Sequence, residues 1–171
     1  MELETERLIL RHIIESDDED IFEYSSNPLV GPDAGWKPHE NIEETRQIMK
    51  EIFLDQESVF GMVLKKSGKL IGSVGLIPDP KRENQNVLML GYAMSHDYWG
   101  IGLMTEASKE VIRYGLEDLN LSRISCCCYP FNSRSRSVIK KCGFEYEGTL
   151  KDCEMRYDGE IFDFECYSLA K

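Results

Sequence analysis

The chain has 171 residues, 42% of them hydrophobic, and a formal net charge of −11 at pH 7. A length of this order is typical of one globular domain with one core, so residues 1–171 are predicted to form a single domain. The acidic balance disfavours nucleic acid and anionic membranes as partners, because phosphates attract clusters of lysine and arginine, and it is compatible with amines and basic protein tails.

The amino-terminal part is predicted to hold a strand and two helices. Residues 4–13 are predicted to form a strand, and the acidic residues that follow suit the positive end of a short helix reaching residue 26. Prolines and glycines make residues 27–38 a loop. Asn41 opens a capping-box pattern that starts a second helix, which runs to residue 54.

Strands and helices alternate in the rest of the chain. A meander of three strands is predicted over residues 59–65, 70–77 and 87–95. Apolar residues at helical spacing then predict a helix over residues 102–119. The remaining elements are a strand at 123–129, a helix at 133–142, and a hairpin of strands at 144–154 and 160–169. This order predicts a mixed α/β fold.

Two glycines, Gly100 and Gly102, stand at the start of the predicted helix 102–119, although glycine disfavours helix. The first amides of a helix lack intrahelical partners and carry partial positive charge, and glycine lets a bulky phosphate approach them. The pattern therefore favours an anion-binding turn, with an ordinary tight turn as the alternative. Walker and dinucleotide-binding loops are excluded, because the lysine of the first and the third glycine of the second are missing.

The sequence contains no pattern typical of a targeting or membrane-spanning segment. No run of about eighteen apolar residues is present, and the acidic start MELETERLIL is unlike a signal peptide, so a cytoplasmic location is expected.

The six cysteines contain no C-x-x-C pair. They are predicted to be reduced, small apolar residues, and no metal site is expected.

Three blocks of the chain carry a family resemblance: LGYAMSHDYWGIGLMTEA, NSRSRSVIKKCGFEYEGTLKD and the closing GEIFDFECYSL. Together they resemble the GNAT N-acetyltransferases, specifically the RimJ/RimL-type branch that acetylates amino termini of ribosomal proteins. The resemblance runs from TERLILR to the last strand. It implies a GNAT fold, with a central, mostly antiparallel sheet of about six to seven strands, a V-shaped splay and about four flanking helices. Acetyl-CoA is the implied co-substrate, and both a monomer and a homodimer are left open.

The resemblance also implies which residues hold acetyl-CoA. The backbone of Met94 and Ser95 would contact the pantetheine inside the V. Asp97 stands where the family has arginine or glutamine, so no side-chain contact to the pyrophosphate is expected at this position. The pyrophosphate would be held by the backbone amides of the glycine turn, which are those of Ile101, Gly102, Leu103, Met104 and Thr105.

Acetyl transfer to an amine needs a route for the amine proton and a proton for the leaving sulfur, but no covalent nucleophile. The tyrosine that many GNAT enzymes use as the acid is replaced by Ile139. Similarity to RimL-type enzymes instead implies Ser135 as the donor near the sulfur, Asn132 as a pantetheine contact and Glu154 as the base. The structural alternatives are that Ser135 is only a first-turn serine, Asn132 only the N-cap of its helix and Glu154 only a solvated strand glutamate. Tyr92 is expected to pack at the V.

Three functions follow from these observations. The first is acetyl-CoA-dependent transfer of an acetyl group to a primary amine by direct attack, the amine being the α-amine of a protein such as a ribosomal protein. The alternatives are an N-acetyltransferase for a small amine (an amino acid, a polyamine or an antibiotic) and a non-catalytic acyl-CoA-binding sensor. By family analogy the acceptor groove lies between the Trp36 loop with its following helix and the hairpin near residues 157–161. An acidic groove suits all positively charged amines.

Overall fold

The computed structural model describes residues 1–171 and contains one eight-stranded sheet, with the strand order β1-β2-β3-β4-β5-β6-β8-β7. Neighbouring strands are antiparallel, except that β5 and β6 are parallel. The strands are β1 (Glu2–Glu4), β2 (Leu8–Arg11), β3 (Val59–Leu64), β4 (Leu70–Pro78), β5 (Val87–Met94), β6 (Arg123–Cys128), β7 (Glu145–Met155) and β8 (Ile161–Ala170). The helices are α1 (Asp18–Ser25), α2 (Gly31–Ala34), α3 (Ile42–Ile52), α4 (Leu103–Arg113) and α5 (Ser133–Lys141), with shorter turns η1 (Glu15–Asp17), η2 (His96–Tyr98) and the π-helical η3 (Tyr114–Asp118).

The predicted mixed α/β fold is confirmed, and most elements lie within a few residues of their predicted bounds. The first predicted strand is divided, because Thr5 turns the chain: Leu8 N donates to Thr5 Oγ1 at 3.0 Å, and Thr5 N donates to Leu8 O at 3.0 Å. The sheet therefore has eight strands rather than six to seven. The predicted loop at residues 27–38 contains the four-residue helix α2, which ends at Gly35 in the left-handed conformation.

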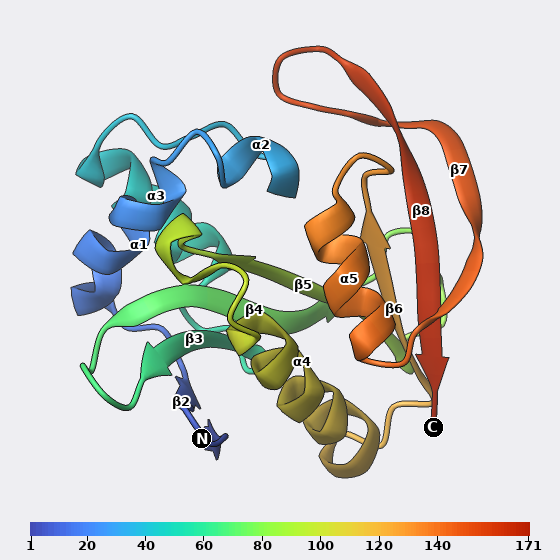
Figure 1. Ribbon diagram of the computed structural model, residues 1–171, viewed down its shortest axis with the longest axis horizontal. Coiled ribbons are helices and arrows are strands. Elements are labelled where there is room, and N and C mark those ends of the chain that lie inside the picture. Colours follow the sequence, from blue (N-terminus) through green and yellow to red (C-terminus); the bar gives the residue numbers. More distant parts are fainter.

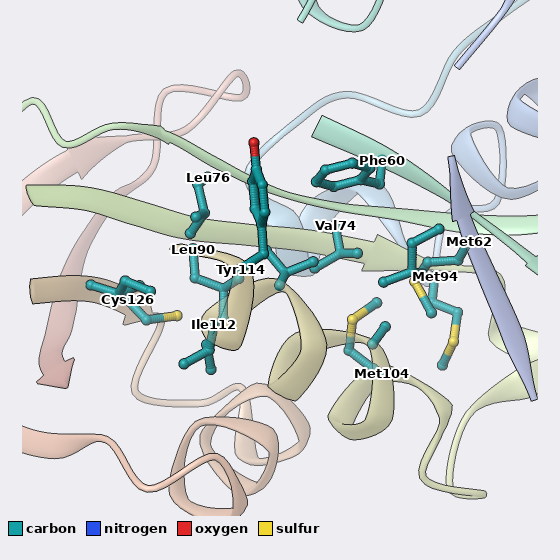
Figure 2. Close-up of a cluster of buried hydrophobic side chains, with 14 of the residues drawn as sticks. Phe60, Met62, Val74, Leu76, Leu90, Met94, Met104, Ile112, Tyr114 and Cys126 are labelled. Carbon is teal, nitrogen blue, oxygen red and sulfur yellow. The ribbon is translucent and has the colours of Figure 1, made fainter. Parts of the chain in front are cut away.

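Helices cover both faces of the sheet (Figure 1). Adjacent strand residues point to opposite faces, and Met62 and Val63 accordingly belong to different core clusters. The larger cluster packs beneath α4 and α5, and Figure 2 shows Met104 and Ile112 among the strand side chains. The smaller cluster, which includes Ile21 and Met49, packs under α1 and α3. No helix of the structure combines the length and the apolar character that a membrane span requires.

The sheet opens between β5 and β6. Their parallel pairing is limited to Val87–Met89 against Arg123–Ser125, although both strands continue beyond these residues. On its other side, β5 stays paired with β4 as far as Met94. Residues 90–94 of β5 therefore have no strand partner on the side that faces β6, and the predicted V-shaped splay lies here.

Helix α4 connects the two diverging strands. Its inner face follows the predicted spacing, with Ala107 and Val111 fully buried. The α-helix ends at Arg113 and is followed directly by the π-helical segment η3. The predicted helix 102–119 therefore has two parts. Gly102 is its N-cap residue with φ +85°, in the left-handed region where glycine is favoured.

Candidate active site

A cavity of about 790 Å³ fills the space where β5 and β6 diverge. Its lining includes residues 89–94 of β5 and 126–129 at the end of β6, together with the starts of α4 and α5. The helix α2 faces the amino-terminal end of α5 across this region (Figure 1). Eight of the predicted site residues line the cavity, and these are Met94, Gly102, Leu103, Met104, Thr105, Asn132, Ser135 and Glu154.

Two predicted residues do not line the cavity. Ile101 has an exposed side chain, 57% accessible, at the outer side of the turn. Ser95 is buried, and its backbone is already bonded, because Ser95 N donates to Ile71 O at 2.8 Å and Ser95 O accepts from Tyr98 N at 3.1 Å. The open edge of β5 is therefore formed by Met94 and the residues before it.

The glycine turn presents free backbone donors to the cavity. The first intrahelical bond at this end runs from Glu106 N to Gly102 O at 3.0 Å, so the amides of residues 102–105 have no partner within the helix. A carbon built on Gly100 would have no atom within 4 Å. This open helix end has the properties of an anion-binding cradle.

Arg7, which belongs to no motif of the glycine turn, supports the turn. Its Nη1 donates to Ile101 O at 3.0 Å and its Nε donates to Glu106 Oε2 at 2.7 Å. A carbon on Gly102 would lie 3.6 Å from Arg7 Nη2. Burial alone would raise the pKa of Glu106, but hydrogen bonds from Thr5 and Arg7 outweigh it and lower that pKa. Arg7 therefore fixes the turn and adds a cation beside it.

Ser135 is held on two sides. Its Oγ lies 2.7 Å from the Tyr92 hydroxyl, and its backbone N donates to Asn132 Oδ1 at 3.0 Å. Asn132 is thus the N-cap of α5, and its Nδ2 also donates to Asp33 O at 3.1 Å. Tyr92 therefore does more than pack at the V, because it fixes Ser135. Burial raises the pKa of Tyr92 well above its ordinary value, which keeps the hydroxyl protonated.

Glu154 lines the cavity from the hairpin of β7 and β8. It is half-buried on β7, and its Oε1 lies near Tyr129 Oη beside Gly35. Burial and, next in size, the charge of Glu154 raise the pKa of Tyr129 to about 12. Tyr129 Oη and Trp36 Nε1 are both buried without a hydrogen-bond partner.

The cavity lining carries charged residues of both signs. Arg134 and Lys141 of α5 lie toward the glycine turn, and the Arg134 guanidinium stands 4.3 Å from the ring of Trp99, which precedes Gly100. Asp33 and Glu154 line the part near Gly35, and Lys81, which also lines the cavity, has its Nζ 5.3 Å from the Phe164 ring. The cations beside the glycine turn suit anionic groups of a ligand, and the carboxylates near Gly35 suit an amine. No group of three or more histidine, cysteine, aspartate or glutamate side chains is placed to hold a metal ion.

Comparisons with known proteins agree on one family. Residues 7–145 match the acetyltransferase (GNAT) domain model. The uncharacterized N-acetyltransferase p20 of Bacillus licheniformis is 30% identical over 99% of this chain and 96% of its own length. The structure of a GNAT-family acetyltransferase from Bacillus anthracis superposes with a TM-score of 0.87 at 25% identity, covering 99% of this chain and 98% of that one. The ribosomal-protein-S5-alanine acetyltransferase from Vibrio fischeri superposes with a TM-score of 0.79 at 25% identity, covering 99% and 96%.

Proposed function

Because the chain belongs to the GNAT family of acetyltransferases, we propose that it transfers an acetyl group from acetyl-CoA to the α-amine at the amino terminus of a protein. One observation carries the proposal: a single cavity joins an open helix amino terminus to Ser135 and Glu154. We further propose that residues 1–171 form one catalytic domain that acts in the cytoplasm. Membership of an acetyltransferase family favours an enzyme over a sensor.

The cavity fits acetyl-CoA on its own features. Residues 102–105 offer unpaired amides for a pyrophosphate, and no side chain blocks Gly100. Arg134 and Lys141 add cations at that end. The partnerless edge of β5 offers backbone groups that can hydrogen-bond the amides of a pantetheine arm. When bound, the thioester supplies an acetyl group that is already activated toward attack by nitrogen.

The protein's own groups supply the proton transfers. Glu154 is the acceptor for the proton of the amine, directly or through a water. Ser135 Oγ is the donor toward the sulfur, and Tyr92 Oη, at 2.7 Å, holds it in place. Because Ser135 lies at the first turn of α5, the partial positive charge at that helix terminus also favours negative charge beside it.

Two observations support a protein acceptor. The cavity end near Gly35 carries carboxylates from Asp33 and Glu154, which attract a positively charged amino terminus. A similar structure is that of a ribosomal-protein-S5-alanine acetyltransferase, at 25% identity. A small amine with the same chemistry is the competing acceptor.

The test is release of free CoA by the purified protein, with acetyl-CoA and a matched panel of acceptors. The panel contains ribosomal-protein amino-terminal peptides, the same peptides with a blocked α-amine, polyamines, amino acids and aminoglycosides. We expect turnover with the free peptides and none with the blocked ones. Turnover with only the small amines would refute the protein acceptor, and silence across the whole panel would refute the proposed activity.

A further inference from the structure

Two oxygens, Tyr129 Oη and Glu154 Oε1, belong to residues that line the cavity and lie beside Gly35. A carbon built on Gly35 would lie 3.1 Å from Tyr129 Oη and 4.0 Å from Glu154 Oε1. Gly35 has φ +93°, a conformation that other residues rarely adopt, so the backbone favours a residue without a side chain next to these oxygens. No hydrogen bond joins the two oxygens, so the protein itself does not link them into one network.

The Tyr129 hydroxyl is a buried polar group without a hydrogen-bond partner. The residue is only 2% exposed, and its Oη has no partner in the protein. A buried hydroxyl without a hydrogen bond is destabilising, whereas phenylalanine would fill the same space without that cost. Tyr129 is one of the residues that line the cavity, so a molecule bound there is the candidate partner of its unpaired hydroxyl.

The Tyr129 ring cannot easily turn its hydroxyl elsewhere. It packs against three aromatic rings, with centroid distances of 5.1 Å to Phe131, 5.2 Å to Phe162 and 5.0 Å to Phe164. Such packing limits the ring to one orientation. The hydroxyl is thus a preformed hydrogen-bonding group beside the Glu154 carboxylate.

The chemistry of the two oxygens selects a primary amine. An ionised carboxylate only accepts hydrogen bonds, and a neutral phenol can accept as well as donate. A neutral primary amine has two N–H groups, which can go to these two oxygens and leave its lone pair free for attack. A neutral secondary amine has one N–H and can satisfy only one of them.

We propose that Tyr129 is a substrate-binding residue, whose hydroxyl acts with the Glu154 carboxylate to hold the nitrogen of the incoming primary amine. This inference rests on the proposed function, because it assigns a recognition group to the same acceptor site. Tyr129 thereby becomes a determinant of specificity for primary over secondary amines.

A pair of CoA derivatives tests the site by binding alone. S-(2-aminoethyl)-CoA carries a primary amine near the sulfur, and S-ethyl-CoA is its counterpart without nitrogen. Dissociation constants are measured by calorimetry for the wild type, for Tyr129→Phe and for the control Tyr114→Phe, which removes a hydroxyl from the main core outside the cavity. We expect the wild type to prefer the amine derivative, and Tyr129→Phe to lose about tenfold of this preference, while S-ethyl-CoA binds all three proteins equally.

The outcomes separate this inference from the proposed function. An undiminished preference in Tyr129→Phe, or an equal loss of affinity for both derivatives, overturns the role of Tyr129 even when the wild type acetylates amines. A wild type that shows no preference for the amine derivative has no amine site, which overturns the inference and removes the recognition step from the proposed function. If the preference is lost in Tyr129→Phe but no amine is acetylated in the release assay, the binding role stands and the proposed activity fails. Thermal unfolding of Tyr129→Phe without ligand should occur at or above the wild-type temperature, since only an unpaired hydroxyl is removed.

Discussion

Replacing Tyr92 by phenylalanine tests how Ser135 acts. The Tyr92 hydroxyl lies 2.7 Å from Ser135 Oγ, within the range of a strong O–H···O hydrogen bond. The net contribution of one such bond is about 0.5–1.5 kcal/mol. If this bond orients Ser135 in the transition state, its loss lowers kcat by about two- to twelvefold. The KM for acetyl-CoA should change little, because the glycine turn is untouched.

The pair is best resolved by a double-mutant cycle. Ser135→Ala removes the proposed proton donor, and kcat should fall by roughly 10²–10⁴-fold. Tyr92→Phe in the Ser135→Ala background should then have no further effect on kcat, because Tyr92 acts through the missing hydroxyl. Steady-state kinetics of the four proteins measure this coupling. Effects of Tyr92→Phe that multiply with those of Ser135→Ala would refute the reasoning, since Tyr92 would then act independently.

A matched control separates chemistry from stability. Tyr146→Phe removes a tyrosine hydroxyl that lies 2.6 Å from Thr149 Oγ1, outside the cavity. Tyr92→Phe, which breaks the more buried bond, should cost about 1 kcal/mol of unfolding free energy, or about 2–4 °C in Tm for a chain of this size. Only the Tyr92 variant should reduce kcat. Equal losses of kcat in both variants would mean that the lower kcat reflects reduced stability of the fold and not the loss of the contact to Ser135.

Three further outcomes follow from the site. Gly102→Glu should abolish acetyl-CoA binding in calorimetry, because it places a side chain and a negative charge at the helix amino terminus, whereas Gly68→Glu, also at a positive φ (+72°) but in an open turn, should bind normally. Glu154→Gln should lower kcat by roughly 10²–10⁴-fold with unchanged acetyl-CoA affinity; an unchanged kcat would exclude Glu154 as the base. The folded-state pKa of Glu106 is depressed, so its stabilising contribution is present above the unfolded pKa, near 4.5, and is lost as pH falls through the folded value. Arg7→Met should therefore lower Tm more at pH 7 than at pH 3, and an equal loss at both would contradict the ion-pair role.

Local patterns in the sequence were sufficient to predict most helices and strands. Asn41 illustrates this, because its side chain accepts from Glu44 N at 2.8 Å, as the capping pattern required. The division of the first strand could not be predicted in the same way. The turn at Thr5 is stabilised by a hydrogen bond from its hydroxyl to Glu106 Oε1, 101 residues away. Only the folded chain brings that carboxylate to the turn.

The site was predictable only in part for the same reason. Glycines before a helix are a local signal, and so the open turn that begins α4 could be inferred from Gly100 and Gly102. The partners Arg7 and Tyr92 gave no such signal, because their roles depend on contacts with α4 and α5 across the sheet. Tyr129 was missed because a hydroxyl without a partner can be recognised only once its surroundings are known.

The topology explains why these groups meet in one cavity. A strand that crosses through a helix to a parallel neighbour brings the carboxyl ends of both strands to the same edge of the sheet, and the linking helix begins there. Here β5, α4 and β6 form that unit, and α5 begins soon after β6, so two helix amino termini point to the splay between the strands. The antiparallel hairpin β7–β8 is outside this rule, and it contributes Glu154 from the side. The proposed acyl-donor end of the site is thus tied to the crossover unit, while the proposed acceptor end depends on the hairpin and on α2, the segments that can vary without disturbing the crossover.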